Sequence, residues 1–138
     1  MTERIIGIDL GTTNSLSATV FTERPEVICQ AGESGMIPSV LSKTRAGWVV
    51  GKEARALQIS APEKTIYSVK RLMGRDYEEL ESELHQFPYT LVRGQRKLVK
   101  IRIEGEEYTP QELSAEILKK VKSSAEQTLG EKIQKAVI

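Results

Sequence analysis

Cysteine and aromatic residues are scarce in this 138-residue chain, and neither sign of charge is in clear excess. A single cysteine, Cys29, cannot form a disulfide within the chain, which excludes a disulfide scaffold and favours a reducing compartment. Twenty Lys and Arg against nineteen Asp and Glu give a net charge of +1, without the basic excess of a general nucleic-acid or membrane-surface binder. No stretch approaches the ~20 apolar residues of a membrane helix, and the apolar run before Asp9 is too short for a secretory signal. We therefore expect a cytoplasmic protein without nucleic-acid or membrane partners.

The sequence does have the composition of an ordinary folded domain, with 39% hydrophobic and 28% charged residues. Arg4–Leu10 is apolar on both faces, which is typical of a buried central strand. Ser15–Phe21 predicts a second strand, and because residues 11–14 are too few for a crossover helix, we expect an antiparallel hairpin. A third strand is expected at Glu26–Gln30.

The middle of the chain predicts short elements. Strands are expected at Val40–Ser42 and Trp48–Val50, and helices at Lys52–Ile59, Thr65–Met73 and Glu78–Leu84. From Tyr89 to Ile103, apolar and charged residues alternate, which indicates a strand with one solvent-exposed face. Cys29 is expected in the core and His85 on the surface. A basic run is interpreted as the solvated face and turn of a strand pair, with a partner surface as the alternative: Arg93, Arg96, Lys97, Lys100 and Arg102.

The clearest helix signal covers Pro110–Leu129. Thr109 is the expected N-cap, Glu112 completes a capping box, and Gly130 is a natural C-cap. The chain then enters the apolar segment Ala136–Ile138 and stops, which favours a fragment of a longer polypeptide over a strand that completes the sheet. The helix has one apolar face, formed by residues at a spacing of four: Leu113, Ile117, Val121 and Ala125.

The strongest candidate site lies between the first two strands, where Asp9 is followed by Gly11, Thr12, Thr13 and Asn14. A carboxylate at the end of a buried strand is costly unless it is paired, hydrogen-bonded or near a cation. Turn N–H groups form anion-binding concavities, and the two hydroxyls add donors, so the segment suits a triphosphate with magnesium. A plain hairpin turn capped by the carboxylate is the alternative. Neither G-x-x-x-x-G-K-[ST] nor G-x-G-x-x-G occurs in the sequence.

The segment IIGIDLGTTNS (residues 5–15) resembles the first phosphate loop of the actin-like ATPase superfamily, which includes actin, sugar kinases and the 70-kDa heat shock chaperones. Later segments resemble the chaperones in particular, and the similarity follows the whole chain in order. These segments are IPSV (37–40), TIYSVKRLMGR (65–75), YTPQELSAEIL (108–118), LGEK (129–132) and AVI (136–138). The stretch from Asp76 to Glu107 is more divergent.

The resemblance implies an α/β protein of the ribonuclease H-like, actin-like ATPase fold. The chain would form an incomplete N-terminal portion of the first lobe, with a mixed sheet. Residues 1–37 would supply the opening hairpin and third strand of the core subdomain. Residues 38–109 would form a peripheral subdomain, and residues 110–138 the long helix and the start of a returning core strand.

The resemblance also implies roles for individual residues. Asp9 would reach magnesium through water, and Gly11, Thr12, Thr13 and Asn14 would surround the phosphates. Lys70 would be catalytic, at the γ-phosphate and the attacking water, although from the residues alone it is a solvated helix lysine. Arg71 would lie near the route that couples nucleotide to peptide binding.

At the level of the protein, the resemblance implies a magnesium-dependent ATPase that is part of a chaperone. Its cofactors would be ATP or ADP and Mg²⁺, with K⁺ as a further candidate. Its partners would be unfolded peptide clients, a J-domain co-chaperone and a nucleotide exchange factor. Two alternatives stay open, a non-catalytic structural or interaction fragment and a sugar kinase of the same superfamily. The lysine–arginine pair at 70–71 speaks against the sugar kinase.

Overall fold

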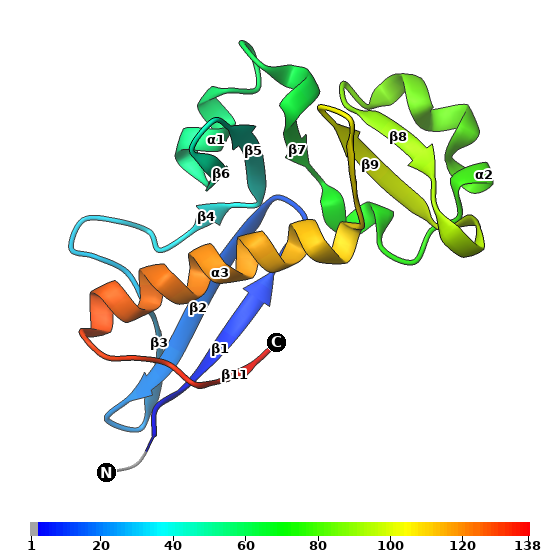
Figure 1. Ribbon diagram of the computed structural model, residues 1–138. Coiled ribbons are helices and arrows are strands. Elements are labelled where there is room, and N and C mark those ends of the chain that lie inside the picture. Colours follow the sequence, from blue (N-terminus) through cyan, green and yellow to red (C-terminus); the bar gives the residue numbers. More distant parts are fainter. Residues whose placement is uncertain (1–2) are drawn as a thin grey trace.

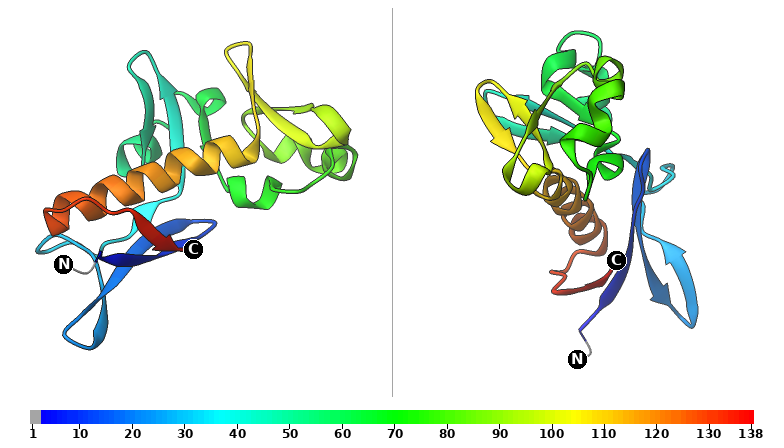
Figure 2. Two further views of the ribbon diagram at one scale, coloured as in Figure 1. Left: turned by 60° about the horizontal axis from the view of Figure 1, so that its bottom comes forward. Right: turned by 90° about the vertical axis from the view of Figure 1, so that its right-hand side faces the viewer.

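The long helix α3 (Pro110–Leu129) runs across the molecule between a main sheet and a group of smaller elements. The computed structural model describes residues 3–138. The main sheet lies on one side of α3, and two three-stranded sheets with short helices lie on the other and beyond its N-terminal end (Figures 1 and 2). Within residues 3–138, no helix is long and apolar enough to cross a membrane.

The main sheet is mixed and has the strand order β11-β1-β2-β3, with β4 paired to β2. Only the β1–β11 pair is parallel, which confirms both the expected antiparallel hairpin and the expected mixed sheet. The α/β class is thereby confirmed. The strands are β1 (Ile5–Leu10), β2 (Asn14–Phe21), β3 (Arg24–Val27), β4 (Ile37–Pro38) and β11 (Lys135–Val137).

The remaining elements form two small antiparallel sheets, β6-β5-β7 and β10-β9-β8, with short helices between them. The strands are β5 (Val40–Thr44), β6 (Gly47–Val50), β7 (Thr65–Tyr67), β8 (Thr90–Arg93), β9 (Val99–Ile103) and β10 (Glu106–Tyr108). The α-helices are α1 (Lys52–Ala56) and α2 (Tyr77–Leu80). The 3₁₀ turns are η1 (Pro62–Lys64), η2 (Val69–Leu72), η3 (Glu81–Gln86) and η4 (Gln95–Lys97).

Helix α3 follows its sequence signals closely. The Thr109 hydroxyl accepts from the Glu112 N–H at 3.1 Å, and the Glu112 carboxylate accepts from the Thr109 N–H at 2.9 Å, which forms the expected capping box. Gly130 ends the helix in the left-handed region at φ 69°. The apolar face predicted from the spacing of four is buried at each of its positions, Leu113, Ile117, Val121 and Ala125.

Several predictions about local structure are wrong. Residues 65–73 do not form a helix, because Thr65–Tyr67 pairs with β5 and Ser68, at φ 54°, interrupts the chain before the η2 turn. Tyr89–Ile103 is not a single strand, because η4 folds β9 back onto β8, but the strand pair with a turn expected for the basic run is confirmed. The remaining differences are shifts or shortening: β3 starts and ends earlier than expected, α1 ends at Ala56, and a 3₁₀ turn continues α2.

Burial of the N-terminal strands also differs from the prediction. Strand β1 is covered by α3 on one face only, so that Ile6 is buried while Ile5 and Asp9 on the opposite face are exposed. Cys29 follows β3 and is exposed, because the chain leaves the sheet after Ile28, the last residue there that packs into the core. His85 is exposed, as expected.

Candidate functional site

The connection between β1 and β2 is a tight turn at the end of the hairpin. A Cβ atom at Gly11 would lie 2.2 Å from the backbone oxygen of Asn14, so only glycine allows the two strands to approach in this way. Asp9 lies opposite Leu16 in the ladder, two residues before Gly11. The carboxylate of Asp9 is solvent-exposed, so its charge is stabilised by water and needs no partner from this chain.

Ser39 holds this turn in place. Its hydroxyl donates to the carbonyl oxygen of Gly11 at 2.8 Å, and its N–H donates to the carbonyl oxygen of Thr13 at 2.8 Å. The hydroxyls of Ser39 and Ser15 lie 2.8 Å apart, and both residues are buried. Ser39 reaches the turn because β4 pairs with the start of β2, with Pro38 opposite Asn14.

The two carbonyl groups bonded to Ser39 fix the orientation of the turn. In the described part of the chain, the N–H groups of Thr12 and Thr13 have no acceptor. They are therefore free to donate to a ligand, and the exposed Thr13 lies at the tip of the turn. Free consecutive N–H groups of this kind are the donors that bind phosphate in proteins.

Lys70 is brought to the same end of the hairpin from a distant part of the sequence. Its Nζ donates to the carbonyl oxygen of Leu10 at 3.1 Å, the last residue of β1. The η2 turn that carries Lys70 is anchored by Val69 and Leu72, which are buried in the larger core. The lysine itself is exposed, and this exposure leaves its ammonium group available to an anion beside the turn.

Arg71 takes a different direction from Lys70. Among the described residues, it makes no hydrogen bond or ion pair with the β1–β2 turn. It lies near Tyr89, whose hydroxyl donates to the carbonyl oxygen of Tyr67 at 2.8 Å. Burial raises the pKa of the Tyr89 phenol above its ordinary value, the nearby Tyr67 raises it further, and the charge of Arg71 opposes both.

The arrangement suits a phosphate group with a hydrated cation. Lys70 and the N–H groups of the turn supply positive charge and donors, while Asp9 supplies a single carboxylate close by. Within residues 3–138, no group of three or more His, Cys, Asp or Glu side chains is placed to hold a metal ion directly. Mg²⁺ does not need such a cage, because it keeps several waters and binds through one or two carboxylates plus substrate phosphates.

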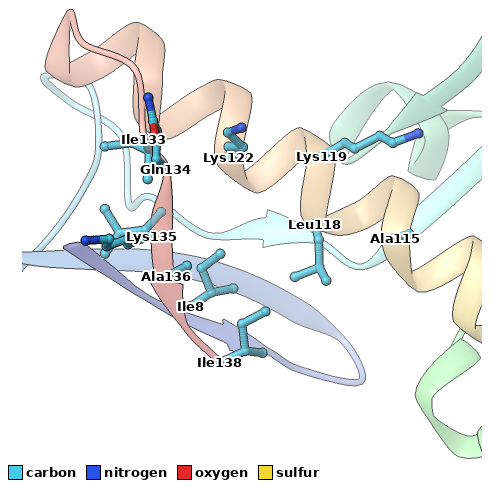
Figure 3. Close-up of a pocket in the computed structure, with 11 residues that line it drawn as sticks. Ile8, Ala115, Leu118, Lys119, Lys122, Ile133, Gln134, Lys135, Ala136 and Ile138 are labelled. Atoms are coloured by element: carbon cyan, nitrogen blue, oxygen red, sulfur yellow. The ribbon is translucent and has the colours of Figure 1, made fainter. Parts of the chain in front are cut away.

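An apolar pocket of about 280 Å³ lies elsewhere, between α3 and the edge of the main sheet (Figure 3). Ile8, Leu118 and Ile138 point into it, from β1, from α3 and from the end of the chain. Asp9, Lys70 and the turn residues 11–14 are not part of its lining. The candidate phosphate site is therefore separate from this apolar pocket.

Comparison with known proteins identifies the family of this chain. The sequence model of the family described as Hsp70 protein matches residues 5–138, and the chain belongs to this family. Chaperone protein DnaK from each of two strains of Thermus thermophilus is 41% identical over 135 residues, which is 98% of this chain. The chain spans 22% of the length of these relatives. The family expected from the sequence motifs is thus confirmed.

Ser39 is the residue that reasoning from the sequence did not assign to the site. The sequence motif IPSV was noticed as a family resemblance, but its serine carried no role. A buried serine between a strand and a turn is a common structural feature, so only the contacts with Gly11 and Thr13 reveal what it does.

Proposed function

We propose that this chain forms the phosphate-binding part of the ATP-hydrolysing domain of an Hsp70-family chaperone, with the ribonuclease H-like, actin-like fold. The observation that carries the proposal is the hydrogen bond from Lys70 to the carbonyl oxygen of Leu10 at 3.1 Å. It joins two segments 60 positions apart in the sequence at one turn. A lysine from a separate element beside free turn N–H groups is an arrangement that a plain hairpin does not require.

Each predicted site residue has a role in this proposal. The N–H groups of Thr12 and Thr13 bind phosphate oxygens, Gly11 allows the close approach, and Asn14 closes the turn. Lys70 positions the γ-phosphate and the attacking water. Phosphoryl transfer depends mainly on positioning the reacting groups and on stabilising charge, and a lysine and backbone amides can provide both.

Asp9 is the residue proposed to hold Mg²⁺, through water. When bound, the ion would neutralise charge on the phosphates of ATP or ADP. The exposed carboxylate fits this use, since a hydrated ion needs an accessible oxygen ligand and not a buried one. A K⁺ ion is a further proposed cofactor, with no residue of this chain assigned to it.

The proposed partners follow from the family. They are unfolded peptide clients, a J-domain co-chaperone and a nucleotide exchange factor, in the cytoplasm. Arg71 is proposed to couple nucleotide to client binding. It lies beside Tyr89 and away from the β1–β2 turn at residues 11–14, named here the phosphate turn, which supports a role other than in ATP hydrolysis itself. The relatives from Thermus thermophilus are named as chaperones, which supports this class of partner.

The proposal can be tested in a chimera in which this chain replaces the matching 135 residues of a Thermus thermophilus relative. We expect the chimera to hydrolyse ATP, and Lys70→Ala to lower single-turnover hydrolysis by ~10²–10³-fold, the usual loss when one preorganised charge is removed. Lys119→Ala is the matched control, because this exposed lysine lies on α3 and its one ion pair among residues 3–138 is with Glu116. Equal hydrolysis by both variants would contradict the role of Lys70.

The 138-residue chain alone is expected to bind nucleotide weakly and not to hydrolyse it. Its phosphate turn is open to water, which weakens electrostatic stabilisation. Titration of the labelled chain with ATP and Mg²⁺, followed by NMR, should shift the amides of Thr12 and Thr13. If the shifts occurred elsewhere, a non-catalytic role would be favoured. Hydrolysis by the chain alone that Lys70→Ala abolished would show that the site is complete.

A further inference from the structure

Positive charge is concentrated in the β8–β9 region, although the net charge of the whole chain is only +1. From Gln86 to Ile103 the sequence contains five Lys and Arg residues and no Asp or Glu. Two of these cations have partners, since Arg93 pairs with Glu78 at 2.9 Å and Arg102 pairs with Glu107 at 2.8 Å. Within residues 3–138, no ion pair is found for the other three: Arg96, Lys97 and Lys100.

A pocket of about 320 Å³ lies at the base of this turn. It is enclosed by the β8–β9 turn, the segment after η2 and the beginning of α3, at the right-hand end of α3 in Figure 1. Three cations line it, and of the described residues in its lining none is acidic. The polar side chains of the lining are Arg75, Gln95, Arg96, Lys100, Thr109 and Gln111.

The backbone holds the basic turn in an uncommon conformation. Arg96 and Lys97 are consecutive residues in the left-handed region, at φ 54° and φ 65°. Residues other than Gly, Asn and Asp rarely adopt this backbone conformation. At Gly94 a Cβ atom would come within 2.8 Å of the Leu98 carbonyl oxygen and 2.9 Å of the Lys100 side chain, so the turn is tightly closed. The backbone that carries Arg96 and Lys97 is therefore confined to a compact turn.

We propose that this pocket, named here the basic pocket, binds an acidic segment of a partner polypeptide. Arg96 and Lys100 would pair with carboxylates, and the amides of Gln95 and Gln111 would donate to the remaining oxygens. Arg75 contributes less, because it already pairs with Glu79 at 2.9 Å. This site is separate from the phosphate turn and does not depend on the proposed ATPase activity.

The lining also indicates which kind of side chain lies beside the carboxylates of the partner. Leu98 lines the pocket and is 41% exposed. An acidic segment that also carries an apolar side chain would cover this surface and remove it from water. No aromatic residue occurs in the described lining, so the pocket offers nothing for a nucleic-acid base to stack on. A protein segment therefore fits better than RNA.

The test uses the 138-residue chain and a short fluorescent peptide of Asp, Glu and Leu. Anisotropy should report binding that weakens with salt, and NMR shifts should gather around Gln95, Lys100 and Gln111. Arg96→Gln and Lys100→Gln are each expected to weaken binding by about three- to five-fold, the range for partly exposed ion pairs.

Lys97→Gln is the matched control. It removes the same charge from the same turn, but Lys97 is not part of the pocket lining, so we expect a loss of at most about 1.5-fold. Equal losses in all three variants would mean a diffuse electrostatic attraction and would overturn the proposal. It would also be overturned by absence of binding, by equal binding of an Asn/Gln/Leu peptide, or by an RNA oligonucleotide that displaces the peptide and binds more tightly.

Discussion

The two sides of α3 differ in how completely they are packed. Buried residues from both small sheets, η2, α2 and the N-terminal half of α3 form one apolar cluster, whose members include Leu72, Ile101 and Leu113. On the other side, a smaller cluster contains only four buried residues, Ile6, Ile28, Ala125 and Ile133, among the residues described. The opposite face of the main sheet is open, and its apolar side chains are exposed: Ile5 (54%), Val20 (60%) and Val27 (42%).

This difference indicates where stability comes from and where it does not. Apolar burial contributes roughly 25 cal/mol per Å², so the larger cluster must supply most of the stabilisation. The hairpin with the phosphate turn belongs to the less packed side. It is positioned by polar contacts that originate in the better packed side, from Ser39 and from Lys70. The candidate site therefore lies where the β1–β2 hairpin is held against the better packed side of the molecule.

The largest effect is expected from a cavity in the larger cluster. Ile101 is completely buried in β9, and Ile101→Ala should lower the free energy of unfolding by ~3–4 kcal/mol, because both apolar contact and packing are lost. Urea unfolding followed by circular dichroism measures the change. A loss below about 1 kcal/mol would mean that the larger cluster is not the main source of stability.

An intermediate effect is expected at the connection between the two regions. Ser39→Ala removes the hydroxyl bond to Gly11 and leaves the buried Ser15 hydroxyl without its partner, which should cost ~1–3 kcal/mol. Hydrogen exchange should also become faster at the amides of the turn. The exposed Ser34 provides the control, since Ser34→Ala should change neither quantity.

The sequence predicts the hairpin and α3 well because their signals are local. The capping box at Thr109 and the spacing of four along α3 depend on residues within one or two turns. The family motif likewise predicted that the β1–β2 turn and Lys70 belong to one site, and the structure brings Lys70 within hydrogen-bond distance of Leu10. Both features can be recognised without knowing the tertiary contacts.

The remaining differences come from tertiary contacts that no local pattern contains. Residues 65–67 form a strand because β5 is available as a partner, and Ser68 adopts a left-handed conformation that lets Lys70 approach Leu10. Ser39 matters only because the distant turn lies beside it. The exposure of Cys29 and of the open face of β1 likewise depends on which elements cover the sheet.

A smaller, pH-dependent effect is expected where β11 returns to α3. The Ile133 N–H donates to Glu126 at 2.9 Å and lowers the pKa of this carboxyl below its ordinary value, and Lys132 at 3.2 Å lowers it further. A lowered folded-state pKa stabilises the protein above the unfolded-state value of about 4.5, and this contribution is lost as the pH falls through the folded-state pKa. Thermal unfolding of the chain should therefore occur at lower temperature below pH 4.5 than at pH 7.

Glu126→Gln separates this group from the other carboxyls. At pH 7 the variant should be less stable than the parent chain, and the difference should shrink at acidic pH, where Glu126 itself is protonated. Glu116→Gln is a suitable control on the same helix, since in the part of the chain that is described the Glu116 carboxylate pairs with Lys119 alone. A constant difference between parent and Glu126→Gln at all pH values would contradict the assignment.

The smallest effect is expected on the open face of the main sheet, where Val20→Thr provides a direct comparison with Val99→Thr. Both exchanges keep the shape of the valine side chain and replace one methyl group with a hydroxyl. Val99 is 2% exposed in β9, so its variant must bury that hydroxyl and should lose ~1–3 kcal/mol. Val20 is 60% exposed, and its variant should stay within ~0.5 kcal/mol of the parent chain. If Val20→Thr cost as much as Val99→Thr, the open face would be covered in solution by a second copy of the chain, and the loss would then diminish on dilution.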